Sequence, residues 1–183
     1  MYMIIDVNST GIPTNNNNYL DFNKFDNARL VDLSYVIYDK HENIIEEYTA
    51  IVKPIDFVIK NSSFHRITQE HAIEHGLNIE DILQNFNTKL STVEVIISHN
   101  FQFDISIILS ECARYNKFEI IENIKKHKTN CTMKLSNLYS SKYLKLTELY
   151  KKLFKQTIEQ NYNSLDNAKY CAKCYLFIKN QIN

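Results

Sequence analysis

Acidic side chains stand at the ends of three predicted elements, where they can act together. Asp6 ends the apolar run of residues 2–6, and Asp104 follows the run "VEVIIS" by a few residues, at the start of a helical pattern. Asp166 and its neighbour Asn167 stand at the start of the last helical pattern. Carboxylates that converge at one edge of a sheet suit hard divalent cations such as Mg²⁺. Two such ions, ~3.5–4 Å apart, can activate a water molecule and stabilise the leaving oxygen of a phosphodiester.

The same positions have a second interpretation. An Asp at the start of a helix is also a routine N-cap, which applies to both Asp104 and Asp166. Position 8, where a metal site would take a second carboxylate on the same face of the strand as Asp6, holds Asn8. Asn supplies an oxygen but no charge. The sequence therefore leaves open a working site, a changed site, or an Asn8 that only hydrogen-bonds its own turn.

Apolar periodicity predicts the elements that carry these residues. Three strands in an antiparallel meander, then a fourth, are predicted at 2–6, 28–39, 44–54 and 92–100. Helices are predicted at 68–76, 78–90, 103–115, 146–154 and 164–182. Gly76 is expected to end the first helix as its C′ residue, and Asn78 to cap the second. The Asn-rich segment 14–27 is expected to be a mobile loop within a single layered α/β domain, 1–183.

The composition is that of an ordinary globular protein. The chain has 183 residues, of which 44% are hydrophobic and 23% charged, enough for one domain with a full core. The 21 Lys and Arg residues balance the 21 Asp and Glu residues, so no global attraction to nucleic acid follows. Local basic patches are candidates at 125–128 and among the lysines of 142–155, with a solvated surface as the alternative.

Cysteine usage and hydropathy predict an intracellular, cytoplasmic protein without a membrane partner. No apolar run is long enough to span a bilayer, and no basic region precedes the short apolar run at the N-terminus. Four cysteines in such a chain are expected to be reduced thiols. Cys171 and Cys174 form a CxxC, but no second metal-spaced pair accompanies them, so we expect them to pack within the last helix.

Five segments, in order, resemble the 3′–5′ exonucleases of the DEDD superfamily. The resemblance is to the histidine subgroup, DEDDh, typified by RNase T and by the epsilon subunit of bacterial DNA polymerase III. "IIDVNSTGIP" is similar to the first motif, D-x-E-T-T-G, and "SHNFQFDISIIL" to the second, H-N-x-x-F-D. The other similar segments are "NARLVDLSYVIYDKHENIIEEYTAIVKP", "FHRITQEHAIEHG" and "YNSLDNAKYCAKCYLF". The resemblance implies an α/β, ribonuclease H-like exonuclease fold. Its central mixed five-stranded sheet, with the first three strands antiparallel, would be flanked by helices.

Family members have four catalytic carboxylates and a general base. Carried over to this chain, Asp6 takes the first role and Asp104 the second-motif role, while Asn8 stands where the family has Glu. The third motif, H-x-A-L-x-D-A, can be matched in more than one register. Matching its apolar residues puts Asn167 at the Asp position and Tyr162 at the His position.

Two other registers use Asp166 as the third-motif carboxylate. One places Asn161 at the His position and misaligns the apolar residues. The other uses the spacing of a sister subgroup, whose Tyr precedes its Asp by four residues as Tyr162 precedes Asp166. One step along a helix turns a side chain by ~100°, so Asp166 does not simply replace residue 167.

The resemblance implies two alternative functions. In the first interpretation the protein binds or acts on nucleic-acid 3′ ends with weakened or lost catalysis, because Asn8 and Asn167 replace carboxylates. The alternative is an active exonuclease using Asp6, Asp104, Asp166 and Tyr162. The metal ligands would be Asp6, Asp104 and Asp166, holding two Mg²⁺ or Mn²⁺ ions if active, and otherwise one or none.

The resemblance also implies partners and binding residues. Single-stranded DNA and RNA 3′ ends are both candidates, as is a protein partner such as a polymerase; no oligomeric state follows. His65 and His99 are expected to be structural and not the missing base. A base could stack on Phe101 or Phe103, with core packing as the alternative. The candidate substrate-binding residues are Ser9, Thr10, His99, Asn100 and Phe101.

Overall fold

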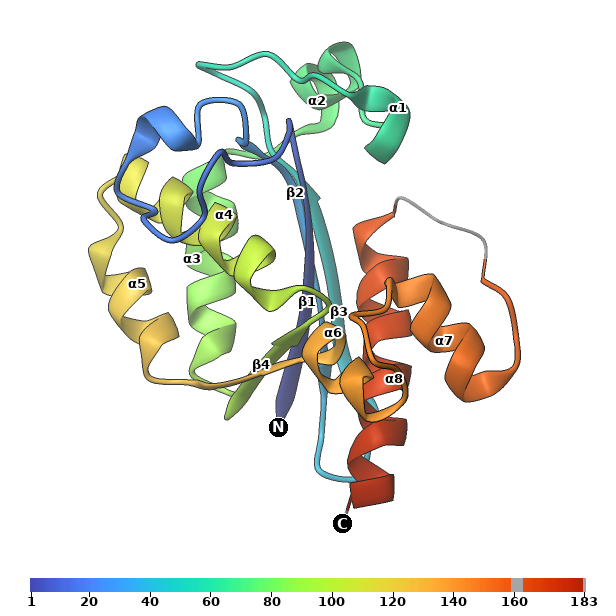
Figure 1. Cartoon of the computed structure of the whole chain (residues 1–183). Helices are drawn as coiled ribbons and strands as arrows, with labels where there is room; N and C mark the ends of the chain where they lie inside the picture. The colour runs from blue at the N-terminus through green and yellow to red at the C-terminus, as the bar shows by residue number, and fades with distance from the viewer. Residues whose placement is uncertain (159–162, 183) are drawn as a thin grey trace.

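The computed structural model describes residues 1–158 and 163–182. A five-stranded mixed sheet lies between two groups of helices (Figure 1). Its strands are β1 (Tyr2–Ser9), β2 (Leu30–Tyr38), β3 (Ile44–Ile51), β4 (Val95–Ser98) and β5 (Lys128–Cys131), in the order β3-β2-β1-β4-β5. β1, β2 and β3 pair antiparallel, and β4 is parallel to both β1 and β5. The predicted fold class and antiparallel meander are confirmed.

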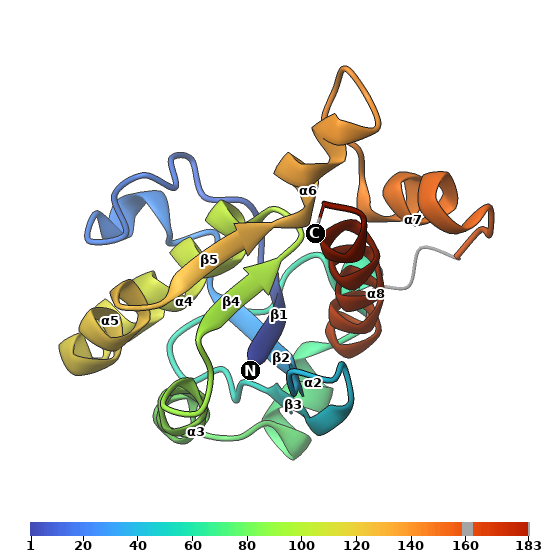
Figure 2. The same cartoon turned by 90° about the horizontal axis from the view of Figure 1, so that it is seen from below.

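The helices cover the two faces of the sheet unequally. α3 (Ile79–Leu90), α4 (Phe101–Arg114) and α5 (Phe118–Lys125) lie on one side, as Figure 2 shows from below. The other side carries α6 (Thr132–Leu135), the 3-10 turn η2 (Ser136–Leu138), α7 (Leu146–Phe154) and α8 (Ser164–Ile182). The short helices α1 (Ser62–His65) and α2 (Gln69–His75) lie beyond the carboxyl end of β1 (Figure 1).

Two apolar layers hold the sheet between these helices. The larger layer includes Met3, Ile5 and Val7 of β1 and packs against α3, α4 and α5. The smaller layer includes Ile4 of β1 and packs against α8. Successive strand residues face opposite sides, so Asp6 and Asn8 lie on the α8 face with Ile4. No helix in the described part of the chain is long and apolar enough to cross a membrane.

Several local predictions are confirmed by the structure. Asn78 caps α3, because its Oδ1 accepts the backbone N–H of Glu80 at 2.8 Å. Cys171 and Cys174 are both buried in α8 among apolar neighbours. The segment 14–27 contains the 3-10 turn η1 (Phe22–Lys24) and contributes the fully buried Phe25 to the core. The mobility of this segment stays a prediction.

Two local predictions need correction. The fifth strand that the family resemblance implied was not located in the sequence, because Lys128–Cys131 is a short, mostly polar strand at the sheet edge without an apolar alternation. Gly76 does end α2, but its φ of −71° is not the left-handed conformation of a C′ glycine. Glycine is needed there because an added Cβ would collide with the carbonyl of Ala72 and the backbone of Lys53.

Candidate active site

Three polar side chains meet on the α8 face where β1 ends and β2 begins. Asp6 lies opposite Ser34, and Asn8 lies opposite Asp32, in the antiparallel pairing of β1 with β2. The pairing shifts register between Asn8 and Ser9, which is a β-bulge type of irregularity common beside active sites. Asp6, Asn8 and Asp32 are therefore fixed by strand register and not by a loose loop.

Asp104 lies near this end of β1, where it contacts both β1 and the end of the neighbouring strand β4. It lies in the first turn of α4, whose N-cap is Asn100 in the left-handed conformation (φ 74°). The alternative interpretation of Asp104 as an N-cap is therefore wrong. Its Oδ1 accepts the backbone N–H of Val7 at 3.3 Å, and its Oδ2 accepts the hydroxyl of Ser98 at 2.5 Å. These bonds hold a carboxylate that is only 2% exposed against the ends of β1 and β4.

The start of α8 brings Asn167 to Asp6. Asn167 Nδ2 donates to Asp6 Oδ2 at 3.3 Å, joining residues at the two ends of the chain. Asp166 lies one position earlier, where its backbone N–H donates to Asn163 Oδ1 at 3.2 Å. This geometry favours the register that puts Asn167 at the family's Asp position. Tyr162 and Asn161, the candidates for the His position, lie outside the described residues.

Asp32 is a site residue that the sequence reasoning missed. Its Oδ1 accepts the backbone N–H of Asn8 at 3.0 Å, and its Oδ2 accepts Asn8 Nδ2 at 3.1 Å. It is only 5% exposed. The available signal was an acidic residue inside the apolar strand "RLVDLSYV", although the sequence could not say that it faces position 8.

Burial raises the pKa of all three acidic groups, Asp6, Asp104 and Asp32. Burial, then the charge of Asp104, raises the pKa of Asp6 well above its ordinary value, against the hydrogen bond from Asn167. Burial raises the pKa of Asp104 to about 7, against the hydrogen bonds from Ser98 and Val7. Burial likewise raises the pKa of Asp32, although its bonds with Asn8 and Ser164 lower it. No cation is among the influences on Asp6 or Asp104 from the described residues.

The stability of the metal-free protein should therefore fall as pH rises toward neutrality. The folded state keeps a proton on Asp104 up to a pKa of about 7, whereas the unfolded chain releases it near 3.8. Folding thus binds a proton in this window, and the free energy of unfolding decreases as the pH rises through it. Thermal unfolding in EDTA from pH 4 to 8 measures the slope. D104N should flatten it, and an unchanged slope in D104N would contradict the assignment.

The donor set fits one hard divalent cation better than two. The carboxylates of Asp104, which is buried, and Asp6, which is partly buried, have no cationic partner among the described residues. Together with the nearby amide oxygens they are oxygen donors of the kind that Mg²⁺ and Mn²⁺ accept. In residues 1–158 and 163–182, however, no three His, Cys, Asp or Glu side chains form a metal-binding group. The two negative charges of ionised Asp6 and Asp104 would balance the two positive charges of a single dication.

The side chains of Ser9 and Thr10 are engaged within the loop that follows β1. Ser9 Oγ donates to the carbonyl of Gly11 at 2.6 Å. Thr10 Oγ1 donates to the carbonyl of Asn27 at 3.0 Å and accepts the backbone N–H of Arg29 at 2.9 Å. These bonds shape the loop, so a substrate role for either residue stays a prediction.

His65 and His99 both hydrogen-bond other parts of the chain. His99 contacts Thr132 Oγ1 at 2.9 Å and the carbonyl of Leu144 at 3.0 Å, and burial lowers its pKa to about 4. His65 contacts the carbonyl of Lys60 at 3.1 Å and accepts the backbone N–H of Ile67 at 3.2 Å. These contacts support the prediction that neither is the missing base.

Phe101 and Phe103 pack partly buried against the larger core layer. Phe101 also lines an open pocket of about 190 Å³ with Gln102, Asn130 and Lys134. Phe103 therefore serves in core packing. Phe101 packs against the same core layer and also borders the open pocket.

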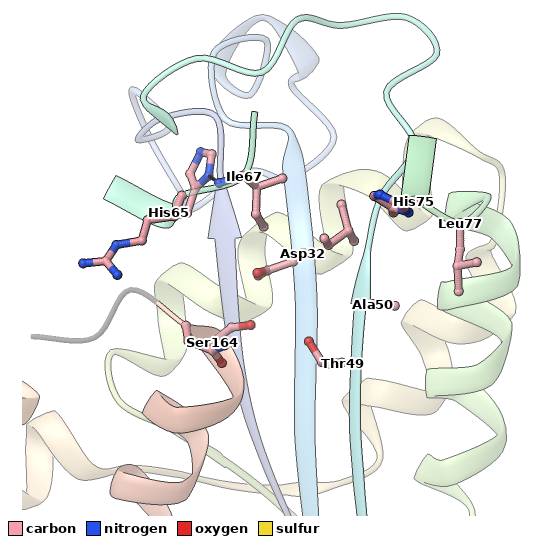
Figure 3. Close-up of a pocket in the computed structure, with 11 residues that line it drawn as sticks. Asp32, Thr49, Ala50, His65, Ile67, His75, Leu77 and Ser164 are labelled. Atoms are coloured by element: carbon pink, nitrogen blue, oxygen red, sulfur yellow. Dashed lines mark hydrogen bonds between the residues drawn. The ribbon is translucent and has the colours of Figure 1, made fainter. Parts of the chain in front are cut away.

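Asp32, one of the three acidic residues of the site, lines an open pocket of about 570 Å³. It is bounded by the start of β2, the end of β3, the segment 65–67 and the start of α8. Figure 3 shows the side chains of Asp32 and Ser164 facing one another, with His65 on the opposite wall. The volume is in the range of small-molecule sites.

The sequence of the chain matches a known family of exonucleases. The exonuclease family named RNase T matches residues 3–175 of the chain. The chain belongs to this family. It is thereby a member of the DEDD-type exonucleases, whose chemistry depends on divalent metal ions. Among curated proteins, none matches the chain significantly in sequence.

Solved exonuclease structures share the fold of this RNase T family member. Exonuclease X in complex with 5′ overhanging duplex DNA has a TM-score of 0.66 and 22% identity, with 99% of this chain and 92% of that chain covered. Exonuclease I of E. coli in complex with a dT13 oligonucleotide has a TM-score of 0.73 and 14% identity. That match covers 97% of this chain but 40% of the longer enzyme.

Proposed function

We propose that this RNase T family protein binds nucleic-acid 3′ ends through one divalent cation, with hydrolysis weakened or lost. The supporting observation is a pair of amides, Asn167 and Asn8, that donate hydrogen bonds to acidic residues of the site. Asn167 donates to Asp6, and Asn8 donates to Asp32, at positions where the family has carboxylates. The cation would be held by Asp6 and Asp104, with Mn²⁺ or Mg²⁺ as the metal.

Charge explains why two-metal hydrolysis would be weak. Two dications facing two carboxylates leave about two positive charges uncompensated, each worth several kcal/mol at ~4 Å even near a protein surface. The loss of a carboxylate at position 8 also removes a group that can orient the attacking water, and losing a base costs ~10²–10⁴-fold. Binding of a phosphate by a single cation is less affected.

The surroundings of the site support a nucleic-acid end as the ligand. The pocket of about 570 Å³ can enclose a nucleoside-sized group beside Asp32. The smaller pocket at Phe101 offers an aromatic edge and Lys134 to a strand approaching from the β5 side. The named neighbours, exonuclease X and exonuclease I, are complexes with DNA. A protein partner, such as a polymerase, and an intracellular location remain parts of this proposal.

A labelled-strand assay tests the proposal. The protein is incubated with a 5′-labelled single strand, DNA and RNA in parallel, with Mg²⁺, Mn²⁺ or EDTA. We expect Mn²⁺-dependent binding of the strand with little or no shortening, and loss of that binding in D6A and D104A. A strand blocked by a 3′-phosphate is the matched control for end recognition.

Two results would contradict the proposed function. Stepwise shortening in Mg²⁺ that both variants abolish would favour the active enzyme, with Asp166 and Tyr162 as the first residues to replace. Binding that is unaffected by EDTA, by D6A and by D104A would exclude the cation from the interaction.

A further inference from the structure

The Asn8–Asp32 pair connects β1 and β2 at the register shift beside Asp6. Both oxygens of Asp32 are bound to the same residue: Oδ1 to the backbone N–H of Asn8 at 3.0 Å, and Oδ2 to Asn8 Nδ2 at 3.1 Å. Asp32 is almost fully buried, at 5% exposure. The backbone N–H of Asn8 thus donates to a side chain of β2 at the point where the strand register shifts, which fixes Asp32 and Asn8 as a unit.

The hydrogen bond to Asp32 Oδ2 orients the NH₂ end of the Asn8 carboxamide. A carboxylate only accepts hydrogen bonds, so the NH₂ end of the amide must face Asp32. The carbonyl oxygen, Oδ1, then lies on the side of the amide away from Asp32. Since β1 lies between β2 and β4, that direction leads away from β2 and toward the side of β1 where Asp104 lies.

We propose that Asp32 is a positioning residue that presents the carbonyl oxygen of Asn8 to a divalent cation bound by Asp6 and Asp104. This inference rests on the proposed function, which supplies the cation. Without Asp32, the amide of Asn8 could present its NH₂ end, which repels a cation. With Asp32 in place, position 8 keeps an oxygen donor although it has lost the charge of the family's Glu.

The pair can be reversed without losing either hydrogen bond. In the N8D/D32N variant, the introduced amide at position 32 can accept the backbone N–H of residue 8 through its oxygen. It can also donate its NH₂ to the introduced carboxylate at position 8. The net charge is unchanged, and position 8 now offers a charged oxygen. The reversed pair should therefore bind the cation at least as well as the wild type does.

The experiment measures Mn²⁺ affinity by electron paramagnetic resonance in five proteins: wild type, D32N, N8A, N8A/D32N and N8D/D32N. We expect D32N to lose about 10- to 100-fold in affinity, as for other groups that orient metal ligands. N8A/D32N should bind no worse than N8A alone, and N8D/D32N should recover wild-type affinity or exceed it. The recovery also shows that the protein folds with Asn at position 32.

Two results would overturn the positioning role while leaving the cation site standing. One is an equal loss from D32N in the wild-type and N8A backgrounds, which would mean that Asp32 acts through its charge alone. The other is unchanged affinity in D32N. If the wild type binds no Mn²⁺, the proposed cation site fails and this inference fails with it.

Nuclear magnetic resonance of the metal-free protein tests the hydrogen bond separately. The side-chain NH₂ resonances of Asn8 should be protected from solvent exchange in the wild type and lose that protection in a D32A variant. Equal exchange in both proteins would overturn the inference whatever the metal titration shows.

Discussion

The double variant N8E/N167D is expected to shorten a 3′ end at least about 10²-fold faster than the wild type in Mn²⁺. The two changes would return carboxylates to both positions where this chain has amides. Asn167 already lies 3.3 Å from Asp6 Oδ2, so a carboxylate there would join the same site. Four carboxylates balance two dications, which allows the second ion to bind and activate water.

The reason for expecting a large effect is electrostatic. In the wild-type site Asp104 has a pKa of about 7, so it is incompletely ionised near neutral pH without a cation, and the pKa of Asp6 is also raised. Adding two more acids makes the metal-free site less stable and the metal-bound site more stable. Mn²⁺ should accordingly raise the melting temperature of N8E/N167D more than that of the wild type.

Controls separate charge from shape in this experiment. N8Q/N167D has the side-chain length of the restored variant at position 8 without the charge, and should gain much less activity. D104A added to N8E/N167D should abolish the gain. If N8E/N167D binds two Mn²⁺ ions and still leaves the strand intact, charge is not what limits hydrolysis. The absent general base of the third motif would then be the limiting group.

The sequence predicts the positions of the retained acids because each follows a recognisable element. The apolar run before Asp6 and the helical pattern after "SHN" predict Asp6 and Asp104 at element ends. The structure continues β1 past Asp6 to Ser9, so that end was predicted too early, and it brings Asp104, in the first turn of α4, against Val7 beside Asp6. The periodic helices α3, α7 and α8 were predicted for the same reason, since a buried face repeats every three or four residues.

Other parts of the site depend on register, which the sequence does not encode locally. That Asp32 faces Asn8 follows from the pairing of β1 with β2 and from the shift after Asn8. One residue of slippage would turn Asp32 to the opposite face of the sheet. β5 was missed for a related reason: its four residues are defined by pairing with β4 and carry little pattern of their own.

Replacing Glu111 by Ala is expected to lower the free energy of unfolding by about 3–5 kcal/mol. Glu111 of α4 accepts Arg29 Nε at 2.7 Å and Arg29 Nη2 at 3.1 Å, and both side chains are buried. Its Oε1 also accepts the backbone N–H of Leu30 at 3.1 Å, at the start of β2. The variant would leave the Arg29 cation buried with Asp56 as an exposed ion-pair partner at 3.1 Å and the Phe57 ring 4.5 Å away.

The same change should loosen the candidate site, because Arg29 connects β2 to the loop after β1. The backbone N–H of Arg29 donates to Thr10 Oγ1, and its carbonyl accepts the N–H of Thr10, both at 2.9 Å. A shift of Arg29 would therefore move the loop after β1 together with the start of β2 that carries Asp32. We expect E111A to weaken strand binding even at temperatures where it stays folded.

Urea unfolding of wild type, E111A, E111Q and R29M/E111L separates the contribution of the hydrogen bonds to Arg29 from the cost of burying the two charges. E111Q should lose less than E111A, because its amide oxygen still accepts a hydrogen bond from Arg29. R29M/E111L should be the most stable of the three variants, since it removes both charges and keeps the apolar volume. A loss below about 1 kcal/mol in E111A, the size of one ordinary hydrogen bond, would mean that Asp56 and water satisfy Arg29. The ion pair would then serve to position the start of β2 without contributing much to the stability of the fold.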